Sequence, residues 1–148
     1  MKKTSTAFTL IEVLVVIGII AILAAVVLVA INPARQFAQA RNSQRISNVA
    51  AILNAVGQNI ADNKGLFTCA AGALPATSTP LKSASGGYNI RDCVVPNYLP
   101  DMPLDPSAGT NTATEYDSGY VISEDATTKR INIGAPAAEL GETIAITR

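Results

Sequence analysis

The first part of the chain is a long run of apolar residues behind a short basic leader. Lys2 and Lys3 lie in the leader, and nineteen residues without a charge or a side-chain amide extend from Val13 to Ile31. As a helix they cover roughly 28 Å, close to the ~30 Å hydrocarbon core of a bilayer. We predict a membrane-spanning helix rather than a cleaved export signal, whose apolar region is only about 7–15 residues long. Because the lysines precede the span, the remainder of the chain is expected outside the cytoplasm.

One acidic residue, Glu12, lies within the apolar run. A charge at the centre of a membrane span costs about 2.5–3.5 kcal/mol on insertion scales, and less near the ends of the span. A helix that served only as an anchor has no use for a carboxylate there. We therefore predict that this helix also packs against a partner that neutralises Glu12. Gly18, further along the run, is expected to allow close packing of another helix.

The helical pattern continues in polar form beyond the apolar run. One apolar stripe follows a spacing of three and four residues, and Gly65 supplies a stop signal. A continuous helix from Phe8 to Ala61 would be about 80 Å long. Pro33 interrupts it, either as a simple kink or as a point where the helix can melt or extend. The stripe consists of Ile46, Val49, Leu53, Val56 and Ile60.

Three arginines follow the span, at positions 35, 41 and 45. We expect them to form a solvated or snorkelling face, and the alternative is charge pairing between subunits.

After Gly65 the helical period ends and Gly, Pro, Ser and Thr become frequent. This region predicts a long irregular connection with one short strand near residues 88–90. Alternating segments around 119–124, 129–135 and 142–148 predict three further strands, with a hairpin turn over residues 125–128. Their isoleucines and the helical stripe can bury one another, so we predict an α+β fold with an antiparallel sheet on the C-terminal half of the helix. Four tyrosines are expected at the sheet edge rather than on an adhesive surface: Tyr88, Tyr98, Tyr116 and Tyr120.

Composition argues against catalysis. The chain has no histidine, which excludes Ser-His-Asp and Cys-His arrangements, and no glycine-rich phosphate loop follows a strand. The formal net charge is zero, so no bias toward nucleic acid is present. We predict that the protein is not an enzyme and needs no cofactor.

Cys69 and Cys93 are the only cysteines, and both follow the span. In an oxidising compartment they can form a disulfide, which would stabilise the outer domain by roughly 3 kcal/mol for a loop of about 25 residues. Two buried free thiols are the alternative. A stretch of acidic residues nearby is expected to form a solvated face, with a calcium site as a weaker hypothesis; its ligands would be Asp105 with Glu115 or Asp117.

The segment FTLIEVLVVIGIIAILAAVVL behind the basic leader resembles the N-terminus of type IV pilins and pseudopilins. The resemblance is specific from Thr6 to about Arg45, and beyond residue 65 it is one of architecture alone. It implies cleavage between Ala7 and Phe8 by a prepilin peptidase, followed by methylation of the new amino group. The residue before the cut is usually Gly in this family, and Ala7 is its smallest substitute, so cleavage is expected. The resemblance also implies that Glu12 pairs with the N-terminal amine of a neighbouring subunit.

Together these features predict four parts: a leader over 1–7, a transmembrane and filament-core helix over 8–31, its amphipathic continuation over 32–64, and a globular head over 65–148. The predicted function is that of a structural subunit, stored in the inner membrane among lipids and polymerised by an assembly platform into a surface homopolymer. The residues expected to carry assembly are Phe8, Glu12, Gly18 and Pro33. A pseudopilin of a secretion or DNA-uptake machine is the alternative within the family. A monomeric membrane-anchored binding module is the alternative from another class.

Overall fold

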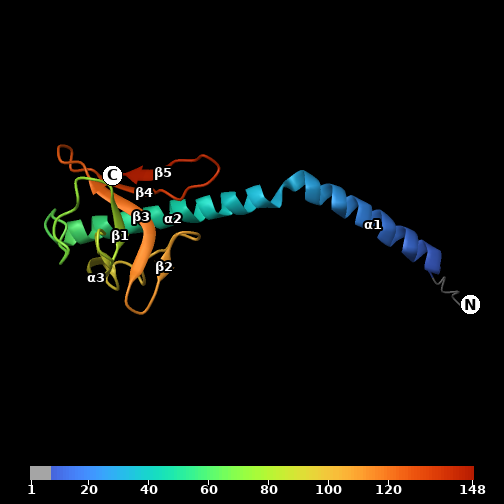
Figure 1. The fold of residues 1–148 in the computed structure, drawn as a ribbon, viewed down its shortest axis with the longest axis horizontal. Helices are drawn as coiled ribbons and strands as arrows, with labels where there is room; N and C mark the ends of the chain where they lie inside the picture. The colour runs from blue at the N-terminus through green and yellow to red at the C-terminus, as the bar shows by residue number, and fades with distance from the viewer. Residues whose placement is uncertain (1–7) are drawn as a thin grey trace, which may run out of the picture. The chain divides into compact units, whose positions relative to one another are not determined.

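The computed structural model describes residues 8–148, and the chain divides into two compact units at Phe37. The first unit holds a long apolar helix. The second, Ala38–Arg148, is the head, and it contains a small antiparallel sheet of five strands (Figure 1). A long N-terminal helix followed by such a sheet confirms the predicted α+β, pilin-like architecture.

The helical region consists of two helices, α1 (Leu10–Ile31) and α2 (Pro33–Asp62), so the chain does not form one continuous helix. Asn32 separates them with a left-handed backbone, φ 46° and ψ 79°. The interruption arises because Pro33 has no N–H to donate and restricts the residue before it, while asparagine tolerates the left-handed region. Pro33 is the first residue of α2, a position where its missing N–H has no helical partner to lose.

Every pair of strands in the sheet is antiparallel, and the order is β1–β3–β4–β5, with β2 paired to the start of β3. The three strands predicted near the C-terminus are present as β3, β4 and β5, and the expected turn joins β3 to β4. Side chains alternate along β3, with every second residue from Tyr116 to Ile122 buried. The strand bounds are β1 Thr79–Lys82, β2 Thr110–Asn111, β3 Tyr116–Glu124, β4 Ile131–Ala135 and β5 Ile144–Thr147.

The core of the head lies between α2 and the sheet. Val49, Leu53 and Val56 from the predicted stripe are buried and share one cluster with the isoleucines of β3 and β4. The ends of the stripe differ, because Ile46 is 48% exposed and Ile60 is only partly buried. Packing of these apolar faces is what orders α2 and the sheet together.

The strand predicted at residues 88–90 is wrong, since those residues form a connection that leads into a short helix, α3 (Arg91–Val94). The strand lies earlier, at β1, where the sequence TPLK contains a proline. Proline is tolerated because β1 is at one end of the strand order. The Tyr88 N–H donates to the carbonyl of Pro80 at 2.8 Å, so the predicted segment contacts β1 without pairing as a strand.

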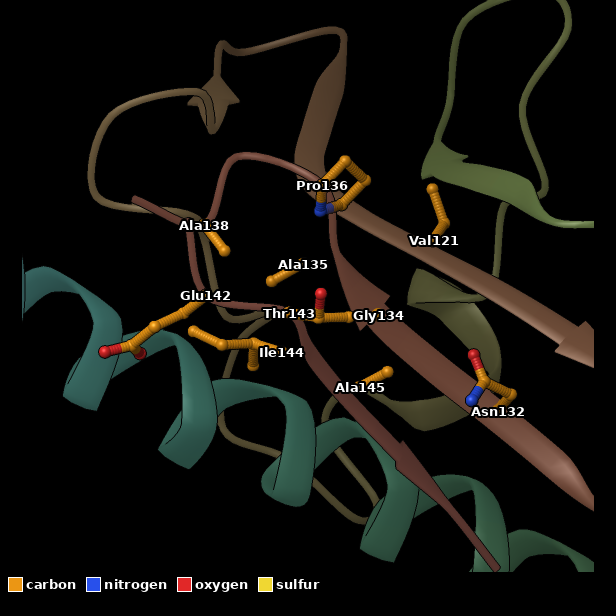
Figure 2. Close-up of a pocket in the computed structure, with 10 residues that line it drawn as sticks. All are labelled: Val121, Asn132, Gly134, Ala135, Pro136, Ala138, Glu142, Thr143, Ile144 and Ala145. Atoms are coloured by element: carbon orange, nitrogen blue, oxygen red, sulfur yellow. The ribbon is translucent and has the colours of Figure 1, made fainter. Parts of the chain in front are cut away.

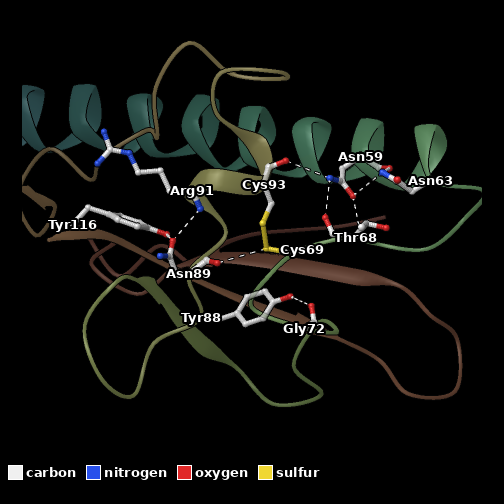
Figure 3. Close-up of a disulfide and its surroundings, with 10 residues drawn as sticks. All are labelled: Asn59, Asn63, Thr68, Cys69, Gly72, Tyr88, Asn89, Arg91, Cys93 and Tyr116. Atoms are coloured by element: carbon white, nitrogen blue, oxygen red, sulfur yellow. Dashed lines mark hydrogen bonds between the residues drawn. A yellow bond between two sulfur atoms is a disulfide. The ribbon is translucent and has the colours of Figure 1, made fainter. Parts of the chain in front are cut away.

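Three of the four tyrosines belong to the core. Tyr88, Tyr116 and Tyr120 are at most 7% exposed. The hydroxyl of Tyr88 donates to the Gly72 carbonyl at 2.7 Å (Figure 3), and burial raises the pKa of Tyr88 to about 12. These three side chains therefore cannot serve as an adhesive surface, and they fill the interior rather than cover a sheet edge.

Candidate functional site

Helix α1 presents an apolar surface with no partner among the described residues of its own unit, 8–37. None of its 22 residues is buried, and Val29 is 85% exposed. Within residues 8–148 it is the one helix long and apolar enough to cross a membrane, with a mean hydropathy of 3.4. Exposed apolar surface of this extent is unfavourable in water, so α1 requires lipid or another protein around it.

Glu12 is the third residue of α1, and it forms a capping box with Thr9, the residue before the helix. The Thr9 amide and hydroxyl each donate to Glu12 Oε2 at 2.9 Å, and the Glu12 amide donates back to the Thr9 hydroxyl at 3.3 Å. The box satisfies backbone N–H groups at the start of the helix. It also fixes the carboxylate at the helix N-terminus, close to Phe8, where the positive end of the helix dipole favours an anion.

A hollow of about 260 Å³ lies at this same end of α1, and Phe8 beside it is 83% exposed. Its wall is entirely apolar, and Glu12 lines it with apolar atoms only. The arrangement offers an apolar recess with one negative charge on its edge, which suits a second apolar chain that carries a cation. The lining residues are Phe8, Glu12, Val13, Val16 and Ile17.

The other two predicted assembly residues lie further along. A Cβ placed on Gly18 would meet no atom within 4 Å, so packing among the described residues gives no reason for glycine there. Pro33 opens α2 beside Asn32, whose side-chain oxygen accepts from the Arg35 amide at 3.3 Å. Asn32 thus ends one helix and caps the next.

In the head, Arg45 does not lie on a solvated face as expected, because its side chain is fully buried. Its guanidinium bonds Asp105 at 2.7 Å and Glu139 at 2.8 Å, and it also donates to the hydroxyl of Ser107 at 2.6 Å. Buried charge requires such pairing. The guanidinium therefore joins α2 to two loops, 103–109 and 136–143, and no charge pairing between subunits is needed to satisfy it.

The backbone around Asp105 explains how its loop reaches α2. Gly119 in β3 has φ +76°, and a Cβ there would lie 2.6 Å from the Cβ of Asp105. The Asp105 amide donates to the carbonyl of Ser118 at 2.8 Å. Glycine is therefore required at position 119 both for its backbone conformation and for the close approach of the loop.

The second loop is held by two neighbouring residues of α2. Arg41 forms a bidentate pair with Glu139, at 2.6 and 2.7 Å. The side-chain oxygen of Asn42 accepts from the Glu139 amide, and its amide group donates to the Glu139 carbonyl and to the Glu142 carboxylate. These contacts fix the backbone and the side chains of loop 136–143 together.

The same contacts shift two carboxyl pKa values. Burial alone would raise the pKa of Asp105, but hydrogen bonds from Arg45 and from the amides of Ser107 and Ala108 lower it to about 2. Hydrogen bonds from Arg41 and then Arg45 lower the pKa of Glu139 to about 2. Both groups are therefore ionised throughout the neutral range, and this network is a structural element rather than a general acid or base.

The predicted disulfide between Cys69 and Cys93 is present, with a Cα–Cα distance of 5.3 Å (Figure 3). Asn59 of α2 secures both ends of the bridge: its amide group donates to the carbonyls of Thr68 and Cys93, at 3.2 and 3.3 Å, and its oxygen accepts from the Thr68 amide. The buried Asn59 was not predicted as a functional or structural residue. The bridge attaches the irregular connection to the end of α2.

The calcium hypothesis can be tested against the donor set. Both oxygens of Asp105 already accept hydrogen bonds from Arg45, and one accepts from two loop amides as well. An oxygen of Asp117 accepts from the Gly119 amide. Within residues 8–148, no group of three or more acidic, histidine or cysteine side chains could hold a metal ion. Asp105 and Asp117 thus hold hydrogen bonds within the head, and a calcium ion, which needs six to eight oxygens, stays a prediction for this region.

A shallow hollow of about 300 Å³ lies over β4 and β5 (Figure 2). Val121, Gly134 and Ala145 occupy matched register positions across three strands, and the small side chains leave the depression. Glu142 is the one titratable group among its lining residues. A single carboxylate in an open depression does not form an acid–base pair of side chains.

Residues 2–28 match the model of the prokaryotic N-terminal methylation motif, the prepilin-type cleavage signature of type IV pilins and pseudopilins. No curated protein and no solved structure matches the chain. The motif covers the leader and most of α1, and it confirms the resemblance stated for that segment. The motif implies processing by a prepilin peptidase and membrane anchoring of the precursor.

The structure brings Phe8 and Glu12 together at the start of α1, while Gly18 and Pro33 lie along the helices. Ala7, on the leader side of the predicted cut, lies outside the described residues. The prediction that Arg45 lies on a solvated face was wrong, although the sequence spacing indicated burial. Arg45 lies four residues before Val49 and so on the same face of the helix as the buried stripe.

Proposed function

We propose that the chain is a structural subunit of a type IV pilus-like surface filament. A prepilin peptidase cleaves between Ala7 and Phe8, the new amine is methylated, and the mature subunit leaves the bilayer for a polymer through α1. The observation that carries the proposal is the combination of the methylation motif over residues 2–28 with a helix whose 22 residues are all unburied in the monomer.

Assembly exchanges one apolar environment for another. In lipid, α1 is covered by acyl chains, and in the filament it is covered by other copies of α1. Little net hydrophobic free energy distinguishes these states, because both remove apolar surface from water. A charge pair can favour the filament over the bilayer, because the carboxylate of Glu12 in one subunit neutralises the methylated amine of Phe8 in the next.

The contact proposed between Phe8 and Glu12 joins different surfaces on the two subunits. Contacts of this heterologous kind need not close into a ring, and they then propagate as a helical filament. Close packing of the helices would use Gly18, where no side chain of the same chain limits the approach of a neighbour. The interruption at Asn32 and Pro33 would let α1 change its environment while the head stays folded.

The first experiment is mass spectrometry of the native N-terminus. We expect a mature chain that starts at a methylated Phe8. A chain that retains residues 1–7 in the surface fraction would overturn the proposal. Ala7→Gly is the matched variant, and it should be cleaved at least as fast as the natural chain.

A second measurement separates the pilus subunit from its alternatives. If shed surface fibres contain this chain as their major component, the pilus role holds. If the methylated chain stays in the cell envelope and secretion or DNA uptake requires it, the pseudopilin alternative replaces it. If it remains monomeric in the membrane and binds its ligand without processing, the anchored binding module replaces both.

A further inference from the structure

The head carries an exposed apolar residue, Leu140, in the loop 136–143. Leu140 is 48% exposed, and its backbone lies in the left-handed region with φ 61°. A leucine in this conformation is disfavoured relative to a glycine. About half of its surface stays exposed on the head. A strained backbone with an exposed leucine points to a contact outside the subunit.

Loop 136–143 presents Leu140 rigidly. Glu139, immediately before it, is bound to Arg41, Asn42 and Arg45 of α2. Glu142, two residues after it, accepts from Asn42 at 3.0 Å. Leu140 is therefore held between two fixed residues, and the exposed residue Glu142 follows it two positions later in the same loop.

A hollow of about 480 Å³ lies around the C-terminal end of α2. Five of its lining side chains are apolar: Ile60, Leu66, Phe67, Ala73 and Leu74. Leu66 is 72% exposed, and the backbone before it turns through positive φ values at Lys64 and Gly65. Apart from Leu140 and Ile46, Leu66 is the only large apolar residue exposed in the described head, Ala38–Arg148.

The hollow also has a charged rim. Lys129 lines it and is 70% exposed, with its Nζ 3.9 Å from the carboxylate of Glu124. Lys64 is exposed next to Gly65. The lining thus combines an apolar floor with one accessible ammonium group, that of Lys129, and with the carboxylate of Glu124 beside it. Lys129 is the group that can complement a leucine with a carboxylate nearby.

The two features lie at opposite ends of one helix. Loop 136–143 is bound at Arg41 and Asn42, and the hollow begins at Ile60, which places them roughly 28 Å apart along α2. Leu140 therefore cannot enter the hollow of its own head, whereas it can enter that of a second copy. Contact between two such ends is head to tail and leaves both outer ends available for further copies.

We propose that loop 136–143 of one subunit docks into the hollow at the end of α2 in the next subunit, with Leu140 as the apolar anchor and Glu142 facing Lys129. The docking rests on the proposed filament function and adds a contact between heads to the packing of α1. The chemical class of the partner is a second copy of this chain.

The test is cysteine cross-linking in filaments of the full chain. Leu140→Cys combined with Leu66→Cys should give, on oxidation, a ladder of multimers that collapses on reduction. Leu140→Cys with Thr110→Cys is the matched control, because Thr110 is exposed in β2 and does not line the hollow. We expect several-fold more multimer from the first pair than from the control, and each single variant should give no ladder. Peptide mapping should show the bridge between Cys69 and Cys93 intact.

Charge reversal gives a second readout that does not depend on new cysteines. Glu142→Lys and Lys129→Glu should each lower filament yield, and the double variant should restore it. Filaments that form normally without a ladder and without this rescue would overturn the docking and leave the proposed function standing. If the natural chain forms no filaments at all, the proposed function fails, and the docking fails with it.

Discussion

Helix α1 and the head both contain many apolar side chains, but α1 exposes them and the head buries them. Each large apolar residue of α1 is at least 51% exposed, whereas Ile52, Ile122 and Ile133 in the head are completely buried. In the described part of the head and helices, every buried side-chain nitrogen or oxygen has a hydrogen-bond partner. Contacts within the head therefore account for its stability, whereas the apolar surface of α1 has to be covered by molecules outside the chain.

The charged residues of the two regions differ in the same way. Arg45 is fully buried among ionised and polar groups of its own chain, so its charge stabilises one tertiary structure. Within residues 8–148, the carboxylate of Glu12 accepts hydrogen bonds only from the neighbouring Thr9, and the residue lies at an exposed helix end. Changes at Arg45 should therefore alter folding, and changes at Glu12 should alter assembly.

The largest expected effect is at Glu12. Glu12→Ala should abolish filament formation without changing membrane insertion or the thermal stability of the head, because it removes the partner proposed for the neighbour's amine. The measurements are filament yield, membrane fractionation and the melting temperature of the full chain in detergent.

Two matched variants separate charge from helix capping at this site. Glu12→Gln keeps an oxygen for the Thr9 amide but loses the charge, and it should fail to assemble. Thr9→Ala removes the capping hydroxyl and keeps the charge, and it should still assemble. The opposite result would assign Glu12 a capping role alone.

Arg45→Met should lower the free energy of unfolding by about 3–5 kcal/mol, because it leaves the carboxylate of Asp105 buried without its cation. Chemical denaturation of the full chain in detergent measures this. The double variant Arg45→Met/Asp105→Leu should recover much of the loss, since it removes both charges together. Arg41→Met, at a partly exposed ion pair, should cost less than Arg45→Met.

Removal of the disulfide should have a somewhat smaller effect. Cys69→Ala/Cys93→Ala should lower the free energy of unfolding by roughly 3 kcal/mol in the chain-entropy model. Asn59 should still hold both segments near α2, so the fold should persist at low temperature. Thermal unfolding of the natural and doubly substituted chains checks this. An unchanged melting temperature would show that the bridge adds nothing to the hydrogen bonds of Asn59.

Acid should produce the smallest of these effects. The folded-state pKa values of Asp105 and Glu139 are about 2, below their ordinary values of 3.8 and 4.5. The stability that they contribute is therefore fully present above about pH 5 and is lost as the pH falls toward about 2. Asp105 accounts for about 2 kcal/mol of it. Denaturation of the natural chain and of Asp105→Asn should show a flatter pH dependence for the variant across this window.

Local sequence patterns predicted part of the head well. Strands β3, β4 and β5 were found because their isoleucines alternate, and an alternating pattern has one simple structural interpretation when one face is buried. Strand β1 was missed because Pro80 interrupts its pattern, and proline is acceptable there only through the edge position of the strand. Strand β2 is two residues long and carries no periodic signal.

The candidate site shows the same division. Phe8 and Glu12 were predicted as assembly residues from the N-terminal segment alone, because cleavage, anchoring and a carboxylate in an apolar run are all local features of the sequence. Arg45 was assigned to a solvated face, since a charge next to a membrane span is ordinarily solvated. Its partners Asp105 and Glu139 lie 60 and 94 residues away in the sequence.

The sequence by itself determined the apolar span, the acidic residue within it, the class of fold and the pair of cysteines, because each depends on composition or spacing over short distances. The tertiary structure decided which charges are buried, where the helix is interrupted, and which apolar residues remain exposed in the head. Those outcomes depend on contacts between segments far apart in the chain. The free energy of burying a charge or a leucine is set by such neighbours and not by the residue alone.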